Sequence, residues 1–373
     1  MSHSPVRPAG PALAGPWRTT VRRILVVRLR LIGDVVFTTP ALTALTRHFP
    51  QARLAYVVEP AAADVVRHLP AIDDLIVAPR LGGWRQTLAD IRLGQQLRRD
   101  RYDLVLDFHG GPRSSLLAWL SRAPVRIGYT IKGRAWMYTH QVERPRELRP
   151  RHSVENQWDL LTPLGIDPPD RETCPTAMGL DPAAVASIEA RLTASGVGPG
   201  HEVVVLHVSA GNPFRRWPLG HFTALVTTLA AGHEHRRILV TSGPSEREAS
   251  RAVIDQARAH LPGEARDRVV SCGEFSLAEV RALCERAALY IGGDSGPLHV
   301  ASTSTVPIVG LYGPTLPVRS APWRSARWVS ESVDVEGLAC RPCDQRVCEP
   351  GDFRCLNRIS PEQVAAAAGR ALA

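Results

Sequence analysis

Two aspartates lie at glycine-containing turns between an apolar run and a helix start. Asp34 ends the segment Ile32-Gly33-Asp34 after the apolar run 24–27, and Asp294 ends Gly292-Gly293-Asp294 after the run 287–291. Glycine permits a tight turn and a close approach of the backbone to a ligand. The free N–H groups at a helix start attract phosphate. Both turns are candidates for chemistry on an anionic ligand, and an ordinary capped helix is the alternative at each.

Two further loops of the second half carry polar side chains that, with Asp294 and Ser295, suit a nucleotide diphosphate. Arg215 and Arg216 follow the run 203–207, and Glu246 follows the run 238–241. A guanidinium binds phosphate through paired hydrogen bonds. Glu246 could accept hydrogen bonds from ribose hydroxyls, or it could simply be a charge at a helix start. Neither glycine turn fits the dinucleotide or P-loop pattern, so the site is expected to be of another kind.

The elements that must position these side chains are parallel strands alternating with helices. Two series of apolar runs are separated by the stretch 165–182, which is rich in Pro and Asp. Strands are predicted at 24–27, 54–58, 75–77, 104–107 and 125–128, then at 203–207, 238–241, 269–271, 289–291 and 307–311. The predicted fold class is α/β, with two Rossmann-like, doubly wound domains facing each other across a cleft. Such sheets bind ligands at the carboxyl ends of their strands.

The length of 373 residues suits two domains of ordinary size. We expect a disordered basic extension over 1–22 and an acceptor-side domain over 23–180. A donor-binding domain is expected over 181–358, followed by a C-terminal helix within 359–373.

The formal charge of +9 comes almost entirely from arginine, since Lys132 is the only lysine. A coding bias explains this usage most simply, although a basic surface also suits acidic partners. No nucleic-acid-binding motif stands out, so no nucleic acid partner is expected. The sequence has neither an 18-residue apolar run nor the apolar core of a signal peptide. A soluble, cytoplasmic protein is therefore expected.

Four of the seven cysteines cluster near the end of the chain, at Cys340, Cys343, Cys348 and Cys355. Disulfides are not expected without a secretion signal. A reduced, metal-free loop is the default interpretation, although four thiols at short spacing could hold a structural zinc ion.

From about 23 to 372 the sequence resembles glycosyltransferase family 9, the ADP-heptose:lipopolysaccharide heptosyltransferases. The segments that carry the resemblance are RILVVRLRLIGDVVFTTPAL at 23–42, DLVLDFHG at 103–110, RIGY at 126–129, WP at 217–218, SGPSE at 242–246, GGDSGPLHVA at 292–301 and GLYGPT at 310–315. The cysteine cluster followed by ISPEQV is also similar to members of this family. The resemblance implies a GT-B fold and inverting sugar transfer without an essential metal.

The resemblance also implies roles for individual residues. Asp34 matches the catalytic aspartate, which would take the proton of the acceptor hydroxyl. Two residues match acceptor contacts, Arg126 and His152. Arg216 stands where the family usually has a phosphate-binding lysine. The remaining matches to donor-binding residues are Glu246, Asp294, Ser295, Gly296 and His299.

The implied reaction moves heptose from ADP-heptose to a hydroxyl of a lipopolysaccharide inner core or a related glycan, with no required cofactor. The alternatives are a transferase of another nucleotide-activated sugar and a non-catalytic nucleotide-sugar-binding protein of the same fold. A lipid-linked acceptor would favour weak contact with anionic membrane, at the inner face of the plasma membrane. Positive charge that could serve this contact is concentrated at Arg113, Arg126, Lys132, Arg134 and the stretch 144–151. Solvated surface arginines are the alternative for these residues.

Overall fold

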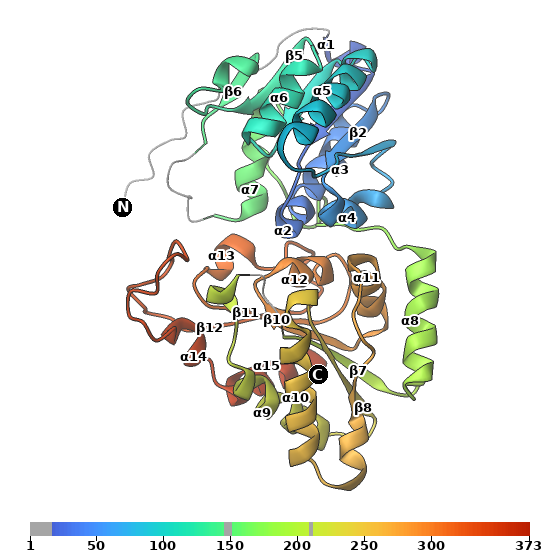
Figure 1. The fold of residues 1–373 in the computed structure, drawn as a ribbon, viewed down its shortest axis with the longest axis vertical. Helices are drawn as coiled ribbons and strands as arrows, with labels where there is room; N and C mark the ends of the chain where they lie inside the picture. Colours follow the sequence, from blue (N-terminus) through green and yellow to red (C-terminus); the bar gives the residue numbers. More distant parts are fainter. Residues whose placement is uncertain (1–16, 145–150, 209–211) are drawn as a thin grey trace. The chain divides into compact units, whose positions relative to one another are not determined.

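The computed structural model describes residues 17–144, 151–208 and 212–373. The chain divides into two compact units between Gly179 and Leu180, one residue before the expected boundary (Figure 1). Of the expected extension 1–22, residues Trp17–Thr20 form a single helical turn, α1. Residues 1–16 lie outside the described part of the chain, as do the turn at 209–211 and residues 145–150 of the arginine-rich stretch.

Unit 1 is built on a six-stranded sheet in the order β3-β2-β1-β4-β5-β6, with every neighbouring pair parallel. The strands are β1 (Arg23–Val27), β2 (Arg53–Val58), β3 (Asp74–Val77), β4 (Leu104–Asp107), β5 (Val125–Tyr129) and β6 (His140–Val142). The central strands are continuous apolar runs because helices cover both faces of a parallel sheet. The order is that of the Rossmann fold and reverses between β1 and β4.

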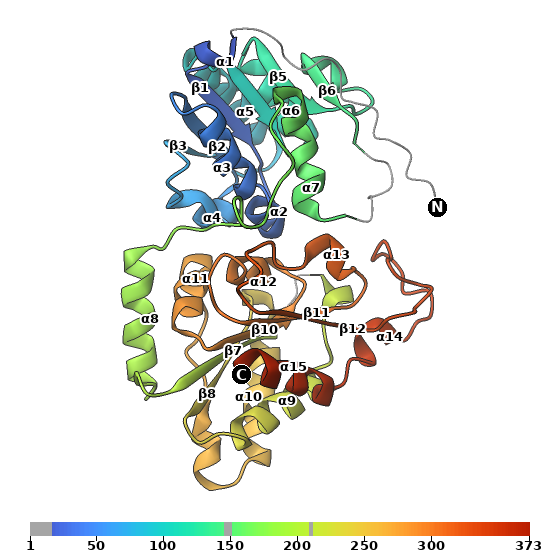
Figure 2. The same cartoon turned by 180° about the vertical axis from the view of Figure 1, so that it is seen from behind.

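The helices of unit 1 lie on both faces of this sheet. They are α2 (Ile32–Val36), α3 (Thr39–His48), η1 (Pro60–Ala62), α4 (Ala63–Arg67), α5 (Gly83–Arg99), α6 (Pro112–Leu120), η2 (Ala135–Met137), α7 (Ser153–Trp158) and η3 (Asp159–Leu164). Leu93 and Leu97 of α5 join Leu117 of α6 in one core against β1, β2 and β4, so these two helices share a face (Figure 1). The other face carries α3 and α4 (Figure 2).

Unit 2 repeats this architecture with the order β12-β11-β10-β7-β8-β9, again entirely parallel. Its strands are β7 (Glu202–His207), β8 (Arg236–Thr241), β9 (Val269–Val270), β10 (Leu289–Gly293), β11 (Ile308–Tyr312) and β12 (Ser330–Asp334). Counted along the chain, this is the same order as in unit 1, and it reverses between β7 and β10. Doubly wound sheets bind ligands at such reversal points.

The helices of unit 2 form two layers around its sheet. They are α8 (Pro182–Ala194), η4 (Pro213–Arg215), α9 (Leu219–Ala231), η5 (Pro244–Glu246), α10 (Arg247–His260), η6 (Gly263–Arg268), α11 (Leu277–Arg286), α12 (Gly296–Ala301), α13 (Pro317–Ser320), α14 (Arg354–Asn357) and α15 (Pro361–Leu372). The main core joins α9, α10 and α15 to one face of the sheet. On the other side α11 packs against α8 and α12 (Figure 2).

The expected fold class is confirmed, with two doubly wound parallel sheets. Two edge strands were not predicted. β12 reads Ser-Glu-Ser-Val-Asp and is half-exposed, and β6 has only three residues. Neither contains the apolar run that a strand covered on both faces requires, because each lies at an edge of its sheet.

Candidate functional site

Asp294 lies immediately after β10, at the reversal point of the second sheet. Its backbone N–H donates to the Leu311 carbonyl at 3.1 Å, and the residue is only 2% exposed. Gly293 precedes it where β10 meets the loop after β7, because a Cβ at Gly293 would lie 3.3 Å from the Arg215 carbonyl oxygen. The small residue therefore lets the loop after β7 approach the aspartate.

The Asp294 carboxylate lies within a buried polar network. Arg215 Nη1 is 3.2 Å from Oδ2, His299 Nε2 is 3.3 Å from Oδ1, and the Thr315 hydroxyl donates to Oδ2. Burial by itself would raise the pKa of Asp294. The hydrogen bond and charge of His299, with Arg215 and Thr315, outweigh burial and lower the pKa to about 2. The carboxylate is therefore ionised and fixed in place before any ligand binds.

Ser295 is the N-cap residue of α12, yet its side chain makes no capping hydrogen bond. Its hydroxyl oxygen is buried and has no hydrogen-bond partner among the described residues. Leaving a buried hydroxyl unsatisfied costs stability. Ser295 and Gly296 thus present an unused polar group and the first N–H groups of a helix beside the Asp294 network.

Arg216 and Glu246 come from different loops and form an ion pair, with 2.7 Å between Nη2 and Oε1. The glutamate is buried and the arginine is exposed on its outer side. Both line a cavity of about 390 Å³, whose wall also includes Trp217 and Phe353. The carboxyl ends of β7 and β8 therefore bring together two residues that the sequence analysis assigned to one donor site.

Thr315 and Gln345 also belong to this site but were not predicted from the sequence. Thr315 follows β11 and donates to Asp294. The amide oxygen of Gln345 accepts hydrogen bonds from Arg215 Nε at 2.7 Å and Asn212 Nδ2 at 2.8 Å. Thr315 lies within GLYGPT at 310–315, one of the segments that carry the family resemblance. That resemblance was the one feature of the sequence that could have indicated a role for Thr315. Gln345 lies in the cysteine loop, and only the fold brings it to Arg215.

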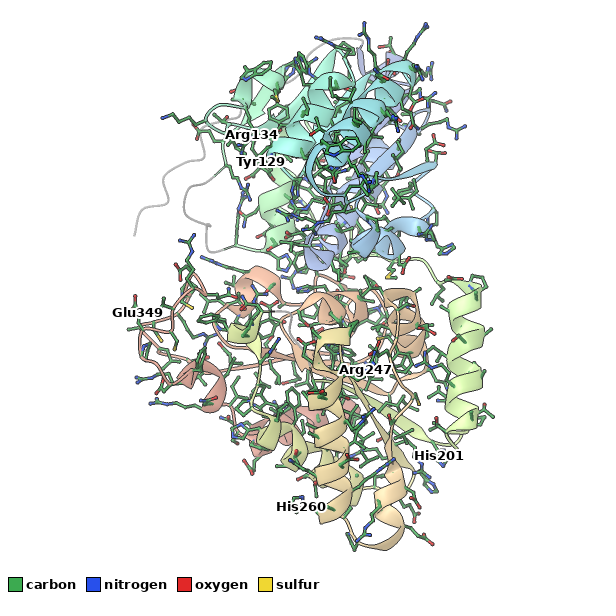
Figure 3. All side chains as sticks on the ribbon, viewed as in Figure 1. Tyr129, Arg134, His201, Arg247, His260 and Glu349 are labelled. Carbon is green, nitrogen blue, oxygen red and sulfur yellow. The ribbon has the colours of Figure 1, made fainter. Side chains whose placement is uncertain are left out.

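The four clustered cysteines line one cavity of about 520 Å³, together with Phe214 and Phe353. Glu349, which Figure 3 labels, belongs to the same loop. In the part of the chain that the structure describes, no three His, Cys, Asp or Glu side chains form a group that could hold a metal ion. As placed here, the thiols do not form a zinc site, and a structural zinc remains an untested possibility.

Asp34 lies in the first turn of α2, after the reversal-point strand β1 of the first sheet. Its carboxylate forms an ion pair with the buried Arg28 and stays 31% exposed. The preceding Leu31 has φ of 66°, a conformation that L-residues rarely adopt. At the carboxyl edge of the sheet, this turn leaves the Asp34 side chain partly open to solvent.

Basic groups surround this first reversal point. Arg28 also donates to the Phe108 carbonyl. Burial, together with the charges of Arg28 and Arg30, lowers the pKa of the His109 imidazole to about 4. His109 is therefore neutral at pH 7, and the positive charge near Asp34 comes from the arginines. An acceptor with acidic groups is electrostatically favoured at such a surface.

Arg126 and His152, the two expected acceptor contacts, are engaged in the framework of unit 1. Arg126 Nε donates to the Met137 carbonyl at 2.9 Å. His152 is buried and caps α7, where Nδ1 accepts from the Val154 N–H at 3.1 Å. The acceptor role of both residues stays a prediction.

Two of the arginines expected to face a membrane also have local partners. Arg113 Nη1 and Nη2 bind Glu59 and Asp90 at 2.9 and 2.8 Å. Arg134, labelled in Figure 3, donates to the Gly110 carbonyl at 3.3 Å. The charge of Arg113 is thus neutralised within the unit, which weakens the expectation placed on it.

Two doubly wound parallel sheets, one in each unit of the chain, are the architecture of the GT-B fold.

Comparison with known proteins identifies the family. The model of glycosyltransferase family 9 (heptosyltransferase) matches residues 91–350. Lipopolysaccharide heptosyltransferase 3 of Escherichia coli is 28% identical over 304 residues, which are 79% of this chain and 84% of the relative. The chain belongs to glycosyltransferase family 9, as the resemblance predicted, and it is a glycosyltransferase enzyme.

Solved structures share the fold. The family 9 glycosyltransferase of Veillonella parvula matches with a TM-score of 0.82 at 24% identity, covering 94% of this chain and 97% of that one. The E. coli ADP-heptose lipopolysaccharide heptosyltransferase II matches with a TM-score of 0.73 at 18% identity, covering 94% and 98%. Among the described residues, no helix is both long and apolar enough to cross a membrane.

Proposed function

We propose that this enzyme transfers heptose from ADP-heptose to a hydroxyl of a lipopolysaccharide inner-core or related glycan acceptor, with inversion at the anomeric carbon. Family membership supports the reaction class. One observation in unit 2 carries the donor assignment. The unsatisfied Ser295 hydroxyl lies next to the Asp294 network, and the loop after β7 adds Arg215 and Arg216.

In this proposal Arg216 binds the donor diphosphate together with the N–H groups of Ser295 and Gly296. Arg216 is exposed and can exchange its glutamate partner for phosphate. Glu246, once released, accepts hydrogen bonds from the ribose hydroxyls. The leaving group is a nucleoside diphosphate, so groups that stabilise its growing negative charge lower the barrier. Transfer needs no metal, because arginine and N–H groups supply the positive potential.

Asp34 acts as the general base. It accepts the proton of the acceptor hydroxyl as that oxygen attacks the anomeric carbon and the bond to the diphosphate breaks. Its exposure supports this role, since an acceptor must reach the carboxylate. Arg28 on its inner side fixes the carboxylate orientation. The surrounding arginines favour an acceptor that carries phosphates or acidic sugars.

Two other functions fit the fold. The donor could carry a different sugar, or the protein could bind a nucleotide sugar without transferring it. Native mass spectrometry with a panel of sugar nucleotides tests the donor, and ADP-heptose should be the one retained. Turnover is then measured with an inner-core acceptor. Retention without turnover would favour the binding protein, and retention of another sugar nucleotide would replace the donor.

We propose further that the enzyme works at the inner face of the plasma membrane as a peripheral protein, because its acceptor is lipid-linked. The support is the basic composition and the family's lipopolysaccharide-related acceptors.

A further inference from the structure

Helix α5 of unit 1 turns an unusual surface outward. Its inner side follows ordinary helical spacing, with Asp90, Leu93, Gly94 and Leu97 buried. A surface helix normally exposes polar residues on the opposite side. Here that side carries Trp84, Leu88 and Ile91, which are 69%, 42% and 44% exposed. These residues are spaced i, i+4 and i+7, so they form one stripe along the helix.

Arginines border this apolar stripe. Arg85, Arg92 and Arg99 recur every seven residues along one side of it, and Arg98 lies on the other. All four are exposed, and none forms an ion pair with another described residue. The only acidic residue of the helix is Asp90, which is buried and bound to Arg113. The outward face of α5 is therefore apolar and positive, with no negative charge.

The surface continues into the loop before the helix. Leu81 in this loop is an exposed apolar residue, as is Val77 at the end of β3. The Gln86 side chain fixes this loop to the first turn of α5, since its oxygen accepts from the Leu81 N–H at 2.7 Å. Its Nε2 donates to the Pro79 carbonyl at 3.3 Å and to Asp90 at 2.9 Å.

The helix is also firmly attached beneath this surface. Arg113 of α6 links Asp90 to Glu59 through two ion pairs. Gly94 lets α6 approach closely, because a Cβ there would lie 2.5 Å from Leu120 Cδ1. The outer residues can therefore bind a partner without unfolding the helix.

We propose that the outward face of α5, defined by Trp84, Leu88, Ile91, Arg85, Arg92 and Arg99, docks on the surface of an anionic phospholipid membrane. A helix with an apolar stripe flanked by basic residues lies in the membrane interface. Tryptophan favours that region because its ring is apolar and its N–H is polar. Each arginine adds attraction to anionic headgroups. The proposal concerns where the enzyme binds in the cell. It rests on the proposed function only in that the proposed acceptor is lipid-linked.

The positive charge of this face of α5 favours a membrane over a second copy of the chain as its binding partner. Pairing two copies of this face would bring at least six unpaired arginines together without a compensating carboxylate on either helix. An anionic headgroup layer neutralises them. This face does not include Arg113, whose charge is already paired with Glu59 and Asp90.

Cosedimentation with vesicles tests the proposal without donor or acceptor, so its failure is distinct from failure of the transferase assignment. Wild type should bind phosphatidylglycerol-rich vesicles at low salt and not vesicles of phosphatidylcholine alone, with binding falling as salt rises. Trp84→Ser with Leu88→Ser should abolish binding. Arg85→Gln with Arg92→Gln should weaken it by about tenfold or more. Matched controls are Val185→Ala and Arg251→Gln, exposed on α8 and α10 of unit 2.

The α5 variants should retain the wild-type urea unfolding midpoint, because the changed side chains are exposed. Lack of wild-type binding at low salt would overturn the proposal, as would equal binding of all variants. A wild-type dimer that the Trp84/Leu88 variant splits, without vesicle binding, would also overturn it by assigning the face to a second copy.

Discussion

Asp34 and Asp294 occupy comparable places in two sheets of the same strand order, yet their surroundings differ. Each follows a strand at the reversal point of its sheet. Asp294 is 2% exposed and lies among Arg215, His299 and Thr315. Asp34 is 31% exposed and has Arg28 as its one ion-pair partner among the described residues. A buried, networked carboxylate suits holding other groups in place, whereas an exposed one can exchange a proton with a substrate.

The largest effect is expected from removing the exposed carboxylate. Asp34→Asn should lower transfer about 10²–10⁴-fold, because the amide cannot accept the proton of the acceptor hydroxyl. ADP affinity should stay within a few-fold. Steady-state ADP release measures the transfer rate, and calorimetry measures the ADP affinity. Asp64→Asn, a half-exposed carboxylate on α4, is the matched control. Near wild-type turnover in Asp34→Asn would show that Asp34 is not the general base and serves only as a charge at a helix start.

Variants of Arg216 test the binding of the donor diphosphate. Arg216→Ala should weaken ADP binding by about 1.5–3 kcal/mol, the range for a hydrogen bond to a charged group. Arg216→Lys should keep much of the affinity, because the family usually has lysine there. Calorimetric titration with ADP is the measurement. Unchanged affinity in the alanine variant would move the phosphate role to Arg215 or another residue.

The buried network should contribute to stability in a pH-dependent way. The folded-state pKa of Asp294 is about 2, below the ordinary 3.8. Its contribution is therefore present above about pH 4 and is lost as the pH falls toward 2. Asp294→Asn should lower the free energy of unfolding by about 2 kcal/mol at pH 7, and by less at pH 3. Urea unfolding at both pH values measures this.

The control for Asp294 is Asp255→Asn, an exposed carboxylate on α10. It should leave the free energy of unfolding nearly unchanged at both pH values. Equal losses for Asp294→Asn at pH 7 and pH 3 would show that the charge of Asp294 does not stabilise the fold.

Removing the unsatisfied hydroxyl of Ser295 should have a smaller effect. Ser295→Ala should weaken ADP binding by about 1 kcal/mol. It should not lower the unfolding midpoint, since the hydroxyl has no hydrogen-bond partner among the described residues. Ser302→Ala is the contrast, because that hydroxyl donates to the His299 carbonyl at 2.6 Å. Full ADP affinity in Ser295→Ala would exclude the hydroxyl as a donor contact.

Chelation is expected to have no effect on transfer. Metal content of the purified protein should be measured first, because removing zinc from the cysteine loop could disturb Gln345 and thereby Arg215. Turnover that EDTA abolishes and magnesium alone restores would refute the metal-free mechanism.

Much of the fold and the position of both aspartates could be predicted from the sequence, because the central strands are short apolar runs followed by glycine turns. Asp34 and Asp294 stand out at those turns, and ten of the twelve strands follow from their apolar residues. What it could not predict depends on contacts between distant segments. Gln345 reaches Arg215 only because the cysteine loop folds back on the sheet. Likewise, the burial of Asp294 compared with Asp34 follows from packing against β11, which no local pattern encodes.

The division of roles between the two carboxylates is tested most directly by titrating ADP into Asp34→Asn and Asp294→Asn under identical conditions. We predict wild-type affinity within a few-fold for Asp34→Asn. For Asp294→Asn we predict an ADP affinity about tenfold lower or more. Without the carboxylate, Arg215 and His299 would no longer be held in place beside the donor loop. The reverse pattern, or equal affinities in the two variants, would contradict the assignment of Asp34 to proton transfer and of Asp294 to donor binding.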